Sequence, residues 1–195
     1  MLFKQNVRRY KTELSHVRPW FKTRNGIVLK MRLLKQDDAA GLVEFFHHLS
    51  PESRRRRFHT NVEYASEEVV RQRSGQFANV DNHTEVGAVI AIHIDADGEH
   101  IVGSTRLARP AHDPDAPEAE AAIVVRDDFH GQGVGQELLR RMVLLAKQMH
   151  VKTVLAIFQP DNEDAIRLFR ELNLPYTISH HQGVTEMRIE VPYAS

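Results

Sequence analysis

Three glycines at alternate positions, Gly131, Gly133 and Gly135, stand between a β-like run and a long amphipathic pattern. Residues 119–125 are mostly apolar and end in a β-branched stretch, which predicts a strand, and residues 133–150 have the apolar spacing of a helix. Because glycine has no side chain, backbone amide groups in such a turn can face a ligand. The chain must therefore fold around a strand, a glycine turn and a helix that follow one another directly.

The composition of this turn favours a bound anion. Side chains at the glycine positions would keep a pyrophosphate away from the backbone, whereas exposed amide groups and the positive end of the helix dipole attract its charge. The alternative is a tight turn without a ligand. Two other phosphate loops do not fit. A dinucleotide fingerprint needs glycine where Gln136 stands, and a Walker loop needs Lys and then Ser or Thr in place of Gln136 and Glu137.

The rest of the sequence predicts a mixed α/β sheet flanked by helices. Asp37 or Asp38 is expected to cap one helix, and Ser50 and Ser66 are expected to begin two more. The polar stretch over residues 74–84 is expected to be a loop. Strands are expected over residues 27–33, 86–94, 101–107, 119–125, 151–158, 176–179 and 185–191, and the later helices over residues 133–150 and 162–172.

Length and composition indicate one globular domain with a basic N-terminal extension. The 195 residues are 42% hydrophobic and 27% charged, and the net charge of zero argues against a nucleic-acid partner. We expect the extension over residues 1–25 and the domain over residues 26–195. No apolar run reaches the roughly 20 residues of a membrane helix, no secretory signal is evident and cysteine is absent, so we expect no membrane partner and a cytoplasmic protein.

The glycine turn resembles the acetyl-CoA motif of the GNAT family of N-acetyltransferases. The family motif is Gln or Arg followed by x-x-Gly-x-Gly or Ala, and the matching residues are His130-Gly131-Gln132-Gly133-Val134-Gly135, with His130 as the one departure. A second family signature, on the next helix, is matched by Asn162, Ala165, Leu168 and Phe169. The resemblance implies a mostly antiparallel central sheet flanked by helices and acetyl-CoA as co-substrate.

Three segments look especially like the acetyltransferase domains of bacterial protein-lysine acetyltransferases: residues 28–32, 45–54 and 119–128. Those domains are often fused to acyl-CoA synthetase-like or nucleotide-binding regulatory domains, and this sequence has neither. The resemblance, which runs from about Ile27 to Val191, implies a free-standing catalytic domain that transfers an acetyl group to an amine.

An ammonium group cannot attack a thioester, so a lysine with a pKa of about 10.4 must lose a proton before or during attack. The resemblance assigns the general base to a glutamate on the strand before the glycine turn, which here is Glu120. Along a strand its side chain shares a face with Ala122, Val124 and Arg126. The alternative is that Glu120 is only the polar end of a strand that follows an acidic loop.

The resemblance also implies residues that contact the cofactor. Many family members use a tyrosine on the last helix to protonate the CoA thiolate, but Phe169 stands there and Tyr176 is out of register, so the acid stays unassigned. A thiol of pKa about 8.5 can leave with solvent as its proton source. Asn162 is expected to contact the pantetheine arm, to cap its helix, or to do both. The residues expected to bind acetyl-CoA are Val124, Val125, His130, Gly131, Gln132, Gly133, Val134, Gly135, Gln136 and Asn162.

Two other groups of residues favour structural roles. Neighbouring histidines, at residues 47–48 and 180–181, point apart on a helix or a strand, so no metal site is expected. The four arginines from Arg54 to Arg57 could bind an acidic partner or the CoA 3′-phosphate, but a solvated helix with one or two ion pairs is the preferred interpretation.

Three functions stay open from the sequence. The chain could acetylate a protein lysine, for example on an acyl-CoA synthetase, or it could acetylate a small-molecule amine. The third function is a CoA-sensing module without turnover. The last function is favoured by His130 and Phe169 and disfavoured by Glu120. Neither residues 51–64 nor residues 180–184 contain a readable specificity code.

Overall fold

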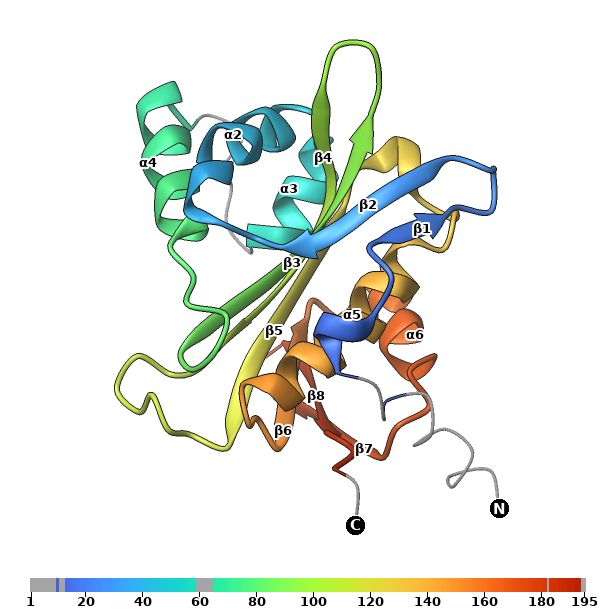
Figure 1. Cartoon of the computed structure of the whole chain (residues 1–195). Coiled ribbons are helices and arrows are strands. Elements are labelled where there is room, and N and C mark those ends of the chain that lie inside the picture. The colour runs from blue at the N-terminus through green and yellow to red at the C-terminus, as the bar shows by residue number, and fades with distance from the viewer. Residues whose placement is uncertain (1–9, 11–12, 59–64, 182, 194–195) are drawn as a thin grey trace.

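The computed structural model describes residue 10 and residues 13–58, 65–181 and 183–193. Within them, strands form one sheet in the order β1-β2-β3-β4-β5-β6-β8-β7 (Figure 1). Neighbouring strands are antiparallel except for the parallel pair β5 and β6. The predicted mixed, mostly antiparallel sheet is thereby confirmed. The strands are β1 (Trp20–Lys22), β2 (Val28–Leu33), β3 (Val86–Ile94), β4 (Glu99–Ala108), β5 (Glu118–Val125), β6 (Thr153–Phe158), β7 (Tyr176–His181) and β8 (Val184–Glu190).

Helices cover both faces of the sheet (Figure 1). Helix α5 lies across one face with α6 beside it, and α2, α3 and α4 lie on the other face. In the described part of the chain, no helix has both the length and the apolar character needed to cross a membrane. The α-helices are α2 (Ala39–His47), α3 (Pro51–Phe58), α4 (Glu67–Ala78), α5 (Val134–Gln148) and α6 (Glu163–Arg170), and the 3₁₀ helices are η1 (Leu14–His16), η2 (Gln36–Asp38) and η3 (Asp127–Phe129).

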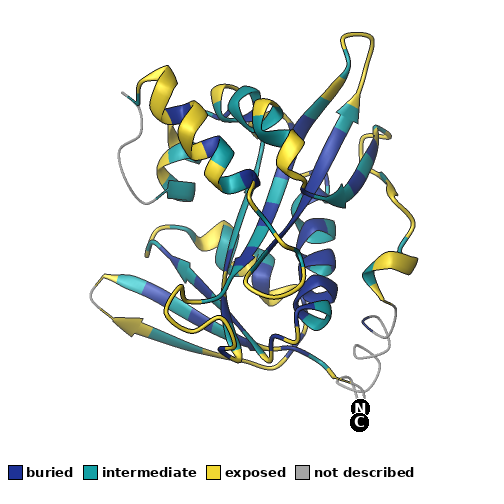
Figure 2. Ribbon diagram, turned by 60° about the vertical axis from the view of Figure 1, so that its left-hand side comes forward, coloured by how far each residue is buried: buried dark blue, intermediate teal, exposed yellow. Residues whose placement is uncertain are grey.

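Helix α5 is the centre of the larger hydrophobic core, and its residues are buried or partly buried along its whole length (Figure 2). It can lie close to the sheet because β3 has a glycine beneath it. A Cβ at Gly87 would lie 2.8 Å from Met149 Sδ, closer than two such atoms can approach. A smaller core on the opposite face joins Phe45 of α2 to Ile90 of β3. The sheet therefore has two covered faces, and its free edges and the ends of its strands are left for function.

Strands β5 and β6 separate toward their C-terminal ends. Their parallel pairing covers only Glu118–Ala121 against Thr153–Ala156. Beyond that point β5 stays paired with β4 as far as Val125, while β6 stays paired with β8 as far as Phe158. Among the described residues, no strand therefore lies beside the backbone of β5 over residues 122–125 on the β6 side, and the glycine turn begins where this free edge ends.

The described part of residues 1–25 packs against the rest of the fold. Trp20–Lys22 form the edge strand β1, which pairs with the start of β2. Arg141 of α5 donates a hydrogen bond from Nη2 to the carbonyl oxygen of Arg18 at 2.7 Å. Residues 1–9 and 11–12 of the expected basic extension lie outside the described residues.

Two local expectations are wrong. Residues 74–78, expected as loop, continue α4, because Val70, Ser74 and Ala78 recur at helical spacing and are buried on one face. Asp38 makes no side-chain cap bond to α2. Its carboxylate instead accepts hydrogen bonds from the Arg32 guanidinium and from the Lys35 amide, each at 2.7 Å. Ser66 does cap α4 as expected, by accepting from the Val69 amide.

Candidate active site

The three glycines of the turn are required for two different reasons. Gly131 and Gly133 have φ values of +69° and +87°, in the left-handed region that strains other residues, and Gly133 is the N-cap of α5. A Cβ at Gly135 would instead lie 2.9 Å from Leu168 Cδ2, so this glycine lets α5 approach α6. The turn therefore combines an unusual backbone path with close helix packing.

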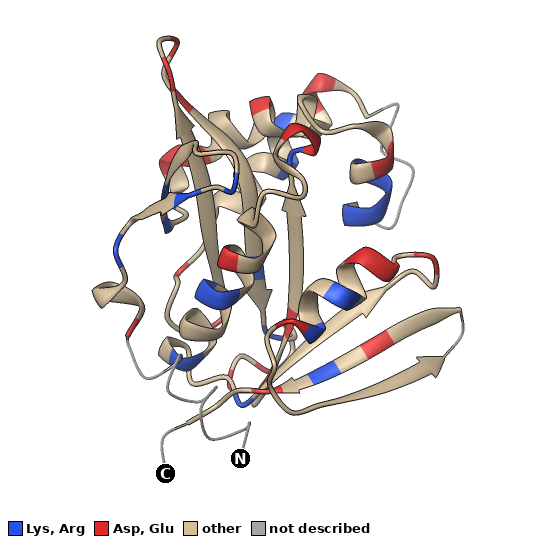
Figure 3. Ribbon diagram, turned by 90° about the vertical axis from the view of Figure 1, so that its right-hand side faces the viewer, with Lys and Arg blue, Asp and Glu red and all other residues tan. Residues whose placement is uncertain are grey.

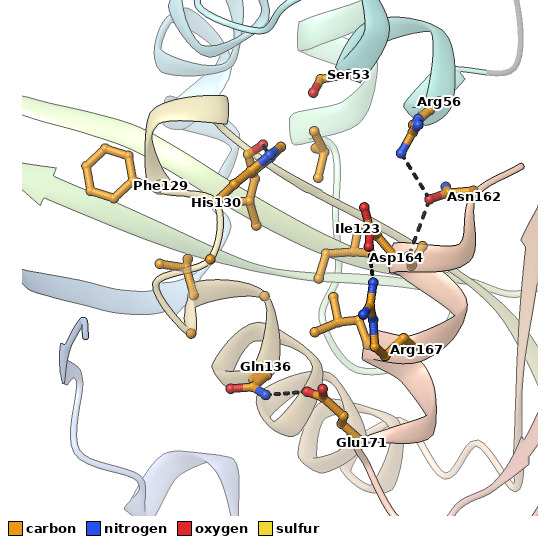
Figure 4. A pocket seen from close by; sticks show the side chains of 18 of the residues that line it. Ser53, Arg56, Ile123, Phe129, His130, Gln136, Asn162, Asp164, Arg167 and Glu171 are labelled. Carbon is orange, nitrogen blue, oxygen red and sulfur yellow. Dashed lines mark hydrogen bonds and ion pairs between the residues drawn. The ribbon is translucent and has the colours of Figure 1, made fainter. Parts of the chain in front are cut away.

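A cavity of about 650 Å³ lies between this turn, the free edge of β5, and helices α3 and α6 (Figure 4). Nearly all of the residues expected to bind acetyl-CoA line it. Gln132 does not, because its side chain is buried and donates from Nε2 to the carbonyl oxygen of Asp128 at 2.7 Å. The expected residues that line the cavity are Val124, Val125, His130, Gly131, Gly133, Val134, Gly135, Gln136 and Asn162.

His130, the departure from the family motif, turns its ring back onto the strand before it. Nε2 lies 2.8 Å from the carbonyl oxygen of Val125, a hydrogen-bond distance at which the nitrogen donates. The ring thus ties the end of β5 to the start of the turn. Asp127 makes a second tie, since its carboxylate accepts from the Ser50 hydroxyl at 2.7 Å and from the Ser53 hydroxyl at 2.8 Å. Helix α3 is thereby held against the turn.

Asn162 caps α6, with Oδ1 accepting from the Ala165 amide at 3.3 Å. The same oxygen lies 3.5 Å from Arg56 Nη1, at the limit of a hydrogen bond, and the side chain faces the cavity (Figure 4). Phe169 is buried, with its ring centroid 5.2 Å from that of Phe158. It offers no proton, and the acid for the CoA thiolate remains unassigned.

The cavity carries more positive charge than the sequence suggested. Side chains of opposite sign also occur, since Arg167 pairs with Asp164 and Gln136 donates to Glu171. Figure 3 shows the basic part of α3 on the same side of the molecule as α6. Sequence reasoning did not assign Arg24 or Arg167 to the site, and for Arg56 and Arg57 it preferred a solvated face over a contact with CoA. The arginines that line the cavity are Arg24, Arg56, Arg57 and Arg167.

A second cavity, of about 560 Å³, lies between the sheet and helices α2, α3 and α4. Its walls are mostly apolar and include Phe46 and Phe77. Glu120, the expected general base, lines this cavity from β5, and its side chain is exposed. The two cavities share Val124 and Arg57 in their walls, so they meet on the strand that carries Glu120.

Two half-buried guanidinium groups stand beside Glu120. The Arg57 and Arg106 side chains both stack on the ring of Phe77, and Arg106 Nη1 donates to the Phe77 carbonyl oxygen at 2.6 Å. Burial lowers the pKa of Arg57 to about 10, with Arg106 acting in the same direction and Glu120 in the opposite one. Burial also lowers the pKa of Arg106. Within the described residues neither guanidinium forms an ion pair.

The arginine run on α3 is therefore only partly a solvated face. Hydrogen bonds from Arg55 and Arg56 lower the pKa of Glu52 to about 2. Arg54 lies 4.5 Å from the centre of the Phe46 ring and donates to the backbone at the end of α2. Arg56 lines the cavity at the glycine turn, and Arg57 lines both cavities. In the described part of the chain, no three His, Asp or Glu side chains gather in an arrangement that could hold a metal ion.

Comparison with known families identifies the family to which this chain belongs. A model of the acetyltransferase (GNAT) domain matches residues 29–174. The chain belongs to the GNAT family. It is an acetyltransferase that uses acetyl-CoA, and the resemblance seen in the glycine turn and around Asn162 is confirmed at the level of the family.

Solved structures place this GNAT chain among several acetyltransferases. The GNAT domain of S. lividans PAT is 25% identical, with a TM-score of 0.73 over 88% of this chain and 95% of that one. A cAMP-binding acyltransferase from Mycobacterium smegmatis shares the fold at 21% identity and a TM-score of 0.58, over 98% of this chain and 52% of that one. Spermidine N-acetyltransferase from Vibrio cholerae, solved with CoA and spermine, shares it at 16% identity and a TM-score of 0.61, over 84% and 95%.

Proposed function

We propose that this chain transfers the acetyl group of acetyl-CoA to a primary amine, with a protein lysine as acceptor and Glu120 as general base. The observation that carries the proposal is the meeting of the two cavities on β5. The cavity at the glycine turn suits the cofactor, and Glu120 lines the neighbouring cavity, which shares Val124 with the first. An amine in the second cavity would thus lie between the base and the thioester.

The first cavity fits the parts of acetyl-CoA. Amide groups of Gly131 and Gly133 and the N-terminus of α5 suit the pyrophosphate, because positive partial charge gathers there. The free edge of β5 over residues 122–125 offers backbone groups to the amide-containing pantetheine arm. Asn162 faces the same space and is the side chain we assign to that arm. The cradle, the free edge and the basic wall are what a long, polyanionic thioester requires.

The residues of the second cavity suit the chemistry of amine acetylation. Glu120 accepts a proton from the acceptor ammonium, directly or through one water. The neutral nitrogen then attacks the thioester carbonyl that bound acetyl-CoA supplies, the C–N bond forms and the C–S bond breaks. The nitrogen releases its second proton to solvent as the amide forms, and the thiolate leaves and takes a proton from solvent. Arg57 and Arg106 assist the first step, because nearby positive charge disfavours the ammonium form of the acceptor.

A lysine acceptor is supported by the lining of the second cavity and by the sequence. The mostly apolar walls suit a four-carbon side chain that ends in an amine. The segments over residues 28–32, 45–54 and 119–128 resemble bacterial protein-lysine acetyltransferases. An acyl-CoA synthetase is the partner class we propose first, and the absence of cysteine is in keeping with a cytoplasmic location.

A small-molecule amine is the second candidate acceptor. A cavity of about 560 Å³ falls within the usual range for a small-molecule site, so a complete acceptor could enter it. The deciding experiment incubates the protein with labelled acetyl-CoA and either a candidate acyl-CoA synthetase or a panel of small amines, and follows the label and free CoA. Label on protein lysines supports the first acceptor class. Label on small amines alone supports the second and rejects lysine.

The role of Glu120 is tested by Glu120→Gln. Positioned bases contribute about 10² to 10⁴ in rate, so kcat should fall by that order while the affinity for acetyl-CoA is unchanged. Glu118→Gln is the matched control, because Glu118 lies on the same strand but pairs with Arg188 at 3.1 Å. A Glu120→Gln variant with full turnover would remove Glu120 from the mechanism.

A further inference from the structure

Arg24 reaches the glycine turn from a position before the residues that the family model matches. It lies between β1 and β2, before the matched residues 29–174. Its amide donates to the carbonyl oxygen of Gln132 at 3.0 Å. Its guanidinium donates to the carbonyl oxygen of Gly131 at 3.1 Å and to Gln136 Oε1 at 3.2 Å. One residue of the N-terminal segment thus holds three successive parts of the turn.

The charge of Arg24 is not neutralised by these contacts. Its hydrogen-bond acceptors are two backbone carbonyls and a side-chain amide, and in the described part of the chain no carboxylate pairs with it. The nearest carboxylate along this network is that of Glu171, which accepts from Gln136 Nε2 and not from Arg24. The side chain is exposed and lines the cofactor cavity. A full positive charge therefore faces the space beside the glycine amides.

The first position of the motif leaves room for such a residue. Where the family usually has Gln or Arg, this chain has His130, and the Nε2 atom of that ring is engaged with the Val125 carbonyl oxygen at 2.8 Å. Charge-assisted hydrogen bonds to phosphate are about twice as strong as neutral ones, and a guanidinium makes them in pairs. Arg24 can provide this kind of contact at the turn, whereas the Nε2 atom of His130 is already bonded to the end of β5.

We propose that Arg24 binds the pyrophosphate of acetyl-CoA, so that the N-terminal segment completes the cofactor site. The proposal rests on the proposed acetyl-CoA site at the glycine turn. It goes beyond the family motif, because the arginine that contacts the pyrophosphate comes from a segment that the motif does not include. The competing explanation is that Arg24 only tethers β1 to the turn through Gly131 and Gln136.

The test measures binding of CoA by calorimetry, without acceptor, for the wild type, Arg24→Lys and Arg24→Gln. Arg24→Gln should bind CoA about tenfold more weakly at low salt, and Arg24→Lys should keep most of the affinity because the charge remains. In 1 M NaCl the difference between wild type and Arg24→Gln should shrink, since screening acts on a Coulombic contact. Lys22→Gln is the control, because Lys22 is an exposed cation of the same segment that does not line the cavity.

Shortened ligands separate the phosphate contact from the tether. Dephospho-CoA should keep the tenfold loss in Arg24→Gln, and pantetheine, which has no phosphate, should bind both proteins equally. Equal CoA affinity in wild type and Arg24→Gln overturns the proposal. A loss that persists in 1 M NaCl or with pantetheine identifies a tether, and a loss that disappears with dephospho-CoA assigns the 3′-phosphate instead. The role of Glu120 is untouched by any of these results, because no acetyl transfer is measured.

Discussion

Arg57 carries a positive charge into a cavity whose walls are mostly apolar, and burial is the main reason why its pKa falls to about 10. A cation in such surroundings destabilises the protonated form of any amine placed near it and so lowers the pKa of that amine. In the proposed reaction the nearest incoming cation is the acceptor ammonium, which must lose its proton before attack. The same guanidinium attracts the carboxylate of Glu120. Arg57 therefore interacts electrostatically with both partners of the proton transfer, the carboxylate of the base and the ammonium group of the acceptor.

Replacement of Arg57 should move the pH dependence of turnover. In Arg57→Gln the bound amine loses a repulsive neighbour, so its pKa rises and the alkaline pH needed for full kcat rises with it, by on the order of one unit. The measurement is the pH profile of kcat, which reports groups in the bound complex. Arg71→Gln is the control, since Arg71 is exposed on α4 outside both cavities. An unshifted profile would mean that Arg57 does not act on the acceptor.

At the scale of elements, the first turn of α5 joins the cofactor turn to the N-terminal segment. Glu137 accepts hydrogen bonds from Arg140 and Arg141, both at 2.8 Å. Arg141 also donates a hydrogen bond to the Arg18 carbonyl oxygen in the N-terminal segment. Only 4% of the Arg141 side chain and 13% of the Glu137 side chain are exposed. Because this cluster is so little hydrated, loss of one partner leaves charge without compensation.

The Glu137 cluster should make the protein sensitive to acid. Burial raises the pKa of Glu137, but the two arginines outweigh burial, and the pKa lies below the ordinary value of 4.5. A lowered pKa means that this contribution to stability is complete above pH 4.5 and is lost as the pH falls through the folded-state pKa. Glu137→Gln should lower the free energy of unfolding by about 3 kcal/mol at neutral pH and flatten its acid dependence, as measured by urea unfolding.

Glu68→Gln is the control for this experiment, since Glu68 occupies the first turn of α4 and is exposed. It should lose at most about 1 kcal/mol, the usual size of a helix-dipole contribution. If the two variants have the same stability and the same acid dependence, the Glu137 cluster contributes nothing beyond its position on the helix.

Elements were predictable from sequence where local chemistry decides them. Alternating patterns, the Ser66 cap and the glycine turn are local signals, and the strands and helices that they predict are present. The helical conformation of residues 74–78 was not predictable from the sequence, because their composition is that of a loop. Only burial of Ser74 and Ala78 against the fold makes them helical. The edge strand β1 escaped prediction for a similar reason, since it depends on pairing with β2.

At the scale of the whole molecule, the site depends on segments that meet only after folding. The glycine turn, Asn162 and Glu120 could be proposed from the sequence because each falls in a recognisable pattern, and the structure places them in the walls of the two adjoining cavities. Arg24 and Arg57 could not be assigned a place, because the chain segments that bring them to the cavities lie far from the motif. The family motif thus identifies the backbone part of the site, and the fold identifies the charges around it.

Binding of acetyl-CoA should stabilise the molecule around the gap between β5 and β6. At a ligand concentration of 100 times Kd, the free energy of unfolding should rise by about 2.7 kcal/mol. Hydrogen exchange should slow most in residues 122–136, which contain the free edge of β5 and the glycine turn. Residues 67–78 of α4, on the opposite face, are the internal reference. Protection confined to α4 would contradict the proposed cofactor site.

The separation of β5 from β6 also bears on how such a protein can diversify. Recognition through main-chain groups over residues 122–125 does not depend on which side chains the strand carries, provided that the strand persists. The walls of the second cavity come mainly from α2, α3 and α4, which are encoded in an earlier part of the chain, over residues 39–78. A duplicated gene could therefore acquire a new acceptor through substitutions in that segment, while the inherited acetyl donor stays the same.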